Sequence, residues 1–195
     1  MHPIHEGVRR FQAEVFPGLS ERFAGLAEGQ SPHSLFITCS DSRIDPGLVT
    51  QSRPGEIFVQ RNAGNLVPEY GRDEGTASAV EYAVAALGVQ LIVVCGHSGC
   101  GAMGALLNPG SLALLPRVAS WVEHAAPTGA AVADYGPARQ LDGAIEHNAL
   151  RQLDNLQTHP SVQVALAEGR LRLEAWVYDI ASGSVRVVGS VGSEL

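Results

Sequence analysis

The feature that most constrains this sequence is a short apolar run, Leu91–Cys95, which ends at a glycine and is followed closely by His97 and Cys100. The run has the length and the β-branched composition of a strand buried on both faces, as in a parallel sheet. His97 and Cys100 would then lie just beyond the carboxyl end of the strand, which is the edge where open α/β sheets bind ligands. The run therefore predicts an α/β fold with a chemically active carboxyl edge.

A second apolar run, Leu35–Thr38, leads into Cys39 in the same way. If the two predicted strands are neighbours in one sheet, Cys39 converges with His97 and Cys100. Two thiolates and one imidazole form a soft ligand set that suits zinc, and three protein ligands leave a fourth position open, as in catalytic zinc sites. The third cysteine, Cys95, falls inside a predicted strand and is interpreted as a small core residue.

Asp41 and Arg43 follow the first of these candidate ligands at alternate positions. A carboxylate beside a guanidinium stays ionised and is held in one orientation, so Asp41 can orient a zinc-bound hydroxide or can itself close the fourth metal position. A surface ion pair worth ~0–1 kcal/mol is the simpler alternative. A phosphate-binding loop with Cys39 as nucleophile is disfavoured, because residues 39–43 contain a carboxylate and no glycine.

Length, charge and cysteine content exclude several classes of protein. The length of 195 residues suits one α/β domain, and we expect a single domain over residues 1–195. The net charge of −7 and the lack of Lys/Arg runs argue against nucleic acid or an anionic membrane as partner. No basic region precedes an apolar core at the N-terminus, and the three cysteines cannot all be paired, so we expect a cytoplasmic protein in a reducing compartment.

Strand, helix and strand at βαβ spacing predict a mostly parallel sheet with right-handed crossovers. The fold class expected is α/β, with about four parallel strands, a C-terminal antiparallel edge strand and flanking helices. The expected strands are Leu35–Cys39, Glu56–Arg61, Leu91–Cys95, Leu171–Ile180 and the edge strand Val185–Val188. The expected helices are Asp73–Leu87, Ala102–Leu107, Leu112–Ala125, Ala138–Gln157 and Pro160–Glu168, with a Gly/Ala-rich loop at Pro127–Asp134.

Residues 1–29 form a predicted amphipathic helical arm, interrupted at Pro17-Gly18, with apolar residues such as Val8, Phe11 and Val15 on one side. The arm can pack on its own sheet, or it can lie across a partner subunit. The second interpretation has support because an extension ahead of the first strand makes no crossover.

The segments Cys39-Ser-Asp-Ser-Arg43 and His97-Ser-Gly-Cys100 together resemble the Cys-x-Asp-x-Arg and His-x-x-Cys segments of the β-class carbonic anhydrases. Residues 54–65 and 81–83 are similar to that family's core strand and turn and to its helix before the histidine. The resemblance implies reversible hydration of carbon dioxide to bicarbonate and a proton. It implies one Zn²⁺ per subunit on Cys39, His97 and Cys100, with zinc-bound hydroxide oriented by Asp41 and Arg43.

The resemblance also implies a homodimer or a larger homo-oligomer, in which the N-terminal helices embrace a neighbouring subunit. Gln30, Phe58 and Tyr82 match the substrate-binding residues of the plant-like members. In a second branch, bicarbonate regulates the enzyme through a Trp, an Arg and a Tyr. Arg61 and Tyr178 match the Arg and the Tyr of that branch, but Phe36 stands at the tryptophan position. We therefore expect the plant-like, unregulated branch and an open site with Asp41 paired to Arg43.

Two rival functions keep the same ligands. A carbonyl sulfide or carbon disulfide hydrolase would use the same zinc on another substrate. A non-catalytic zinc-binding homologue would be expected to lack at least one of the five motif residues, and all five are present.

Overall fold

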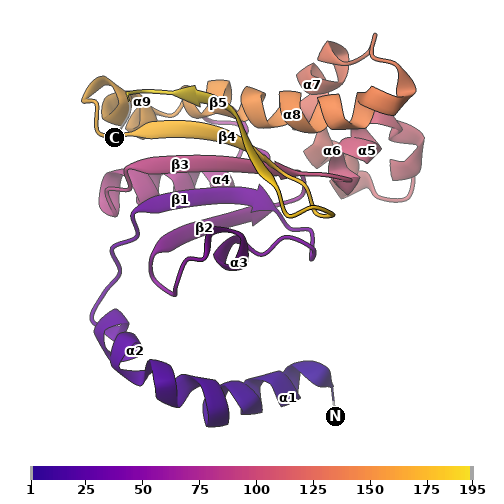
Figure 1. The fold of residues 1–195 in the computed structure, drawn as a ribbon. Helices are drawn as coiled ribbons and strands as arrows, with labels where there is room; N and C mark the ends of the chain where they lie inside the picture. The colour runs from indigo at the N-terminus through magenta and orange to yellow at the C-terminus, as the bar shows by residue number, and fades with distance from the viewer. Residues whose placement is uncertain (1, 194–195) are drawn as a thin grey trace. The chain divides into compact units, whose positions relative to one another are not determined.

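The structure is a computed structural model that describes residues 2–193. The chain divides between residues 31 and 32 into two compact units. The first is the helical arm, and the second is an α/β unit built on one five-stranded sheet (Figure 1).

The strand order in the sheet is β2-β1-β3-β4-β5. The strands are β1 (Ser34–Cys39), β2 (Ile57–Asn62), β3 (Leu91–His97), β4 (Arg172–Tyr178) and β5 (Val185–Val191). The first four run parallel, and β5 pairs with β4 in the antiparallel direction. The expected sheet, with its C-terminal antiparallel edge strand, is confirmed.

The central strands carry the two apolar runs. Every residue of β1 is buried, as is every residue of β3 after Leu91, whereas β2 and β5 are only partly buried. Strands that are covered on both faces need continuous apolar sequence, which explains why these two runs do not alternate. Because Thr38 pairs with Cys95, Cys39 and His97 leave the sheet at the same edge.

Seven α-helices flank the sheet in the described part of the second unit. They are α3 (Pro46–Thr50), α4 (Glu74–Glu81), α5 (Gly101–Leu107), α6 (Pro116–Val122), α7 (Ala126–Ala131), α8 (Pro137–Leu156) and α9 (Pro160–Ala167). A π-helical turn, Tyr82–Ala86, extends α4, and 3₁₀ turns lie at Pro109–Leu112 and Glu123–Ala125. Helices α4, α8 and α9 pack their apolar side chains with one face of β1, β3 and β4 in the largest core cluster.

The loop expected at Pro127–Asp134 is wrong in its first part, because α7 occupies Ala126–Ala131. Proline in the first turn is compatible with a helix start. Packing then decides the conformation: Thr128 is buried, and Gly129 lies against Leu106 closely enough that an added Cβ would be 3.5 Å from its Cγ. The helix expected at Leu112–Ala125 is shorter, since α6 begins at Pro116.

The arm is helical throughout its described length. Helix α1 (Pro3–Arg10) continues through a π turn and a 3₁₀ turn, Phe16–Leu19, into α2 (Ser20–Ala27), so Pro17-Gly18 changes the helix type without ending it. None of residues 2–31 is buried. Across residues 2–193, the structure has no helix with the length and apolar character needed to span a membrane.

A buried histidine makes the stability of the fold depend on pH. His159 is 2% exposed, and its Nε2 donates to the Pro68 carbonyl at 3.1 Å. Burial lowers the pKa of this imidazole, against a smaller opposing effect of the carbonyl. In the unfolded chain a histidine has a pKa of about 6.5 and binds the proton more readily. The stability that neutral His159 confers is therefore complete above pH ~6.5. It is lost as the pH falls through the lower pKa that His159 has in the folded protein.

We expect His159→Gln to lose less stability than the parent protein when the pH is lowered from about 7.5 to about 5. Urea unfolding at both pH values measures this, with the exposed His5→Gln as control. An equal loss of stability in His159→Gln and in the parent would show that His159 is not responsible.

Candidate metal centre

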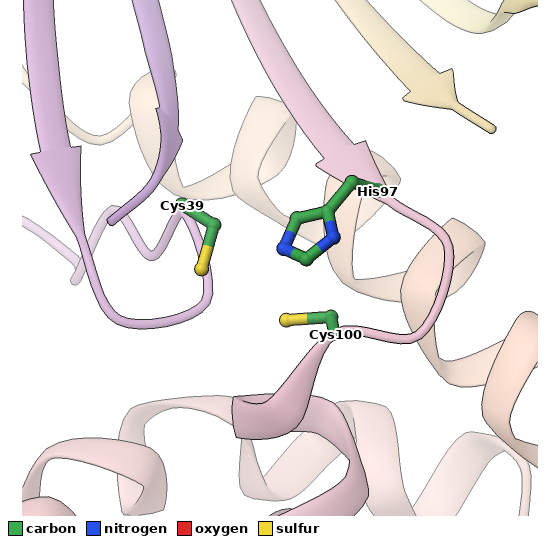
Figure 2. Close-up of side chains that lie close together, drawn as sticks. All are labelled: Cys39, His97 and Cys100. Atoms are coloured by element: carbon green, nitrogen blue, oxygen red, sulfur yellow. The ribbon is translucent and has the colours of Figure 1, made fainter. Parts of the chain in front are cut away.

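Three side chains from separate parts of the chain converge at the carboxyl edge of the sheet. Cys39 ends β1, His97 ends β3, and Cys100 directly precedes α5. One ligand atom from each lies within 4.8 Å of the other two, and all three residues are buried. Figure 2 shows the two sulfur atoms and the imidazole ring facing one another. The predicted convergence is confirmed, and the three residues could hold a zinc ion.

The His97 ring is oriented for metal binding. Its Nδ1 lies 3.0 Å from the Ser98 carbonyl oxygen. A carbonyl only accepts, so Nδ1 carries the proton and Nε2 is left with a free lone pair. Nε2 is buried and has no hydrogen-bond partner among the described residues. A buried nitrogen without a partner is costly, and a metal ion beside the two sulfurs would satisfy it. The residues therefore fit zinc.

The two sulfurs are electrostatically unequal. The hydrogen bond from the Cys100 thiol is the largest effect that lowers the pKa of the Cys39 thiol, to about 4. Burial opposes this shift, while the Gly64 N–H, 3.3 Å from the Cys39 Sγ, supports it. The same contact raises the pKa of Cys100. Cys39 is therefore the sulfur that loses its proton first, and metal binding would deprotonate Cys100 as well, because thiolates are the form that binds metals.

Asp41 and Arg43 form a bidentate pair at the edge of this centre. Arg43 Nε and Nη2 donate to the two carboxylate oxygens at 2.9 and 2.7 Å, and the Arg43 N–H adds a bond of 2.9 Å. These bonds hold the pKa of Asp41 well below its usual range. Arg43 Nη2 also donates to the Gly99 carbonyl at 3.1 Å, and Asp41 Oδ2 lies 3.8 Å from His97 Nε2. The pair thus connects the loops that follow β1 and β3.

Arg61 is a residue of the centre whose structural role the sequence did not indicate. Its Nε and Nη2 donate to the Cys39 carbonyl at 3.0 and 2.9 Å, and Nη2 also donates to the Asp41 and Ile44 carbonyls at 2.7 and 3.0 Å. One guanidinium thus fixes the backbone of the loop that carries Cys39 and Asp41. The sequence feature that could have indicated this role is the position of Arg61 near the end of β2, the strand that pairs with β1.

Of the predicted substrate-binding residues, Phe58 lies apart from the ligands of its own chain along the sheet. Phe58 and Tyr82 lie together, with ring centroids 5.9 Å apart. However, Phe58 pairs with Leu35, whereas Cys39 pairs with Asn62, four residues further along β2. At about 3.3 Å per residue this is a separation of ~13 Å along the strand. Gln30 belongs to the arm unit. The roles of these three residues stay predictions.

Comparison with known proteins gives consistent matches. A family model described as carbonic anhydrase matches residues 34–185. A carbonic anhydrase of Pseudomonas aeruginosa is 52% identical over 189 residues, which cover 95% of this chain and 86% of that protein. The solved structure of the β-carbonic anhydrase CcaA has a TM-score of 0.92 and 41% identity, and the match covers 98% of each chain.

A further solved structure is one of two described as tetrameric β-carbonic anhydrases of Sordaria macrospora. It has a TM-score of 0.84 and 27% identity, covering 98% of this chain and 99% of that chain. The comparisons do not favour the sulfur-compound hydrolase or the non-catalytic homologue. The family match covers most of the chain, the sequence relative covers nearly all of it, and the ligand geometry agrees with both, so the chain belongs to the β class of the carbonic anhydrase family.

Proposed function

We propose that this chain is a zinc-dependent carbonic anhydrase, which catalyses the reversible hydration of carbon dioxide to bicarbonate and a proton. The observation that carries the proposal is the convergence of Cys39, His97 and Cys100 around the unpartnered His97 Nε2. Three protein ligands leave room for a reactant beside the metal. When bound, zinc would supply the Lewis acidity that makes water a nucleophile, although two thiolates would leave that water less acidic than three histidines would.

Asp41 would orient the attacking water. Its carboxylate is ionised, it lies at the edge of the ligand set, and it can accept a hydrogen bond from an oxygen at the open position. Arg43 holds both carboxylate oxygens, so the carboxylate cannot rotate freely. Accepting that hydrogen bond aims an oxygen lone pair at the carbon of carbon dioxide, which is catalysis by orientation.

Stopped-flow hydration of carbon dioxide, paired with a metal assay, tests this function. Activity is expected to follow zinc content: it should be lost when a chelator removes the metal and should return when zinc is restored. Parallel assays on carbonyl sulfide and carbon disulfide identify the substrate. Faster turnover of either sulfur compound than of carbon dioxide would overturn the proposal.

We further propose a cytoplasmic homodimer or larger homo-oligomer in which the arm packs on a partner subunit. The arm exposes apolar side chains that a solitary chain would leave in water: Ile4 is 65% exposed and Val8 51%. Solved relatives described as tetrameric support assembly. In such an assembly Gln30, Phe58 and Tyr82 would line the partner's pocket, which accounts for the distance of Phe58 from the ligands of its own chain.

The double variant Ile4→Glu/Val8→Glu is expected to assemble less well than the parent, because charges would replace an apolar pair one helical turn apart. Sedimentation velocity should show a smaller mass at equal concentration. Glu14→Gln, an exposed polar substitution in the same arm, is the control and should leave the mass unchanged. An unchanged mass for the double variant would assign the arm to its own subunit.

We also propose that the protein belongs to the plant-like, unregulated branch. Phe36, at the position of the regulatory tryptophan, has no polar side-chain atom and packs edge-on against Trp176, with ring centroids 6.0 Å apart. Arg61 Nε and Nη2 already donate to three backbone carbonyls. Crystals soaked in bicarbonate should therefore show none bound at Arg61, and bicarbonate found there would contradict this assignment.

A further inference from the structure

A single peptide group connects an indole ring to one of the two sulfurs of the metal centre. The Gly64 N–H donates to Cys39 Sγ at 3.3 Å, and Trp121 Nε1–H donates to the Ala63 carbonyl at 2.8 Å. The Ala63 C=O and the Gly64 N–H belong to the same planar peptide unit. A donor on the carbonyl polarises this unit and strengthens the bond that its N–H makes, as in any chain of hydrogen bonds.

The residue at the end of this connection has to be glycine. Gly64 has a φ of +84°, in the left-handed region, and an added Cβ would be 3.0 Å from the Ala102 Cβ and 3.3 Å from the Met103 Cε. The absence of a side chain lets the peptide approach the Cys100–Met103 segment and the Cys39 sulfur together.

Three side chains of α8, which we call the amide ladder, hold the rest of the loop that follows β2. The amide ladder is Asn148, Gln152 and Asn155, which are 1%, 1% and 5% exposed. Its members bond to one another and to the loop backbone: to the Gly64 carbonyl at 2.9 Å, and to the Val67 N–H and carbonyl at 2.8 Å each. The loop is therefore rigid, and Trp121 is the group that acts directly on the peptide facing the sulfur.

We infer that Trp121 is a positioning residue for the metal centre: its indole N–H fixes and polarises the Ala63–Gly64 peptide so that the Gly64 N–H offsets part of the charge on the Cys39 thiolate. The inference rests on the proposed zinc function. A thiolate that accepts a hydrogen bond donates less charge to its metal, and such outer contacts tune the ligand and the metal together. Trp121 thus acts on the reaction without touching the substrate.

The chain offers a matched pair of variants, because it has two tryptophans and each indole donates at 2.8 Å: Trp121 to Ala63, and Trp176 to the Glu174 carboxylate. Replacement by phenylalanine keeps a ring and removes the donor. In the Co²⁺-substituted protein, Trp121→Phe should move the sulfur-to-cobalt charge-transfer band to lower energy. Its kcat with zinc should fall by about 10-fold at unchanged zinc content and KM, whereas Trp176→Phe should match the parent in every respect.

Nuclear magnetic resonance of the ¹¹³Cd²⁺-substituted parent protein tests the geometry without any variant. A scalar coupling between ¹¹³Cd and the Gly64 amide proton is expected across the N–H···S bond, and it should weaken in Trp121→Phe alone. No coupling in the parent, or full coupling and an unmoved cobalt band in Trp121→Phe, would overturn the inference. Failure of the zinc-loaded parent to hydrate carbon dioxide would instead overturn the proposed function, since the cadmium coupling does not depend on turnover.

Discussion

Cys39→Ala is expected to abolish zinc binding and to reduce carbon dioxide hydration by about 10³-fold or more, since the metal supplies the nucleophile and enzymes commonly accelerate their reactions by ~10⁶-fold. Cys39 is the sulfur that loses its proton more readily, and its carbonyl is already fixed by Arg61. Removal of its Sγ leaves two protein ligands, which is too few for a catalytic zinc site. Zinc per chain after dialysis, followed by stopped-flow hydration, measures both effects.

Cys95→Ala is the matched control, because it also removes a buried sulfur. Cys95 lies one residue before Gly96 in β3, is fully buried, and donates weakly from Sγ to the Gly96 carbonyl at 3.4 Å. Burial raises the pKa of its thiol to about 12, so it stays protonated and does not act as a metal ligand at neutral pH. Cys95→Ala should therefore keep one zinc per chain and near-parental activity. Zinc retained by Cys39→Ala, or lost from Cys95→Ala, would contradict the assignment of ligands.

The parts of the site that could be predicted from the sequence share one property: the local pattern determines their place. The apolar runs of β1 and β3 predict central strands, and Cys39 and His97 lie at or just after the ends of these runs. Parallel neighbours necessarily bring such residues to one edge. For the same reason the pairing of Asp41 with Arg43, which are two residues apart, could be expected before the fold was known.

The surroundings of the ligands could not be predicted, because they come from distant segments without a local signal. Trp121 reaches a carbonyl 58 residues away, and Asn148 reaches one 84 residues away. The residue types at positions 62–65, Asn-Ala-Gly-Asn, are typical of a turn, but they do not indicate that a backbone N–H is directed at a sulfur. Helix α7 was missed for a related reason, since Gly/Ala-rich composition predicts a loop until the packing of Thr128 and Gly129 is known.

Asp41→Asn is expected to lower kcat/KM by roughly 10²–10³-fold while one zinc per chain is retained. The amide keeps the shape of the carboxylate but loses its charge, so it cannot accept hydrogen bonds from Arg43 on both sides and still orient a water molecule. Asp45→Asn is the control: Asp45 caps α3 by accepting from the Leu48 N–H at 3.0 Å, and asparagine caps helices equally well. Stopped-flow hydration and metal analysis of both variants measure the difference.

The size of the fall in kcat/KM of Asp41→Asn decides whether the Asp41–Arg43 pair orients a reactant or is only a surface ion pair. The side chain of Arg43 is 52% exposed, and a pair with one partner so exposed contributes ~0–1 kcal/mol to stability. A purely structural pair would therefore leave the folded fraction and the hydration rate nearly unchanged. A rate that falls 100-fold with the fold and the zinc intact requires Asp41 to act on the reactant. An unchanged rate would reduce the pair to a surface contact and leave the orientation of the attacking water to the backbone around the metal.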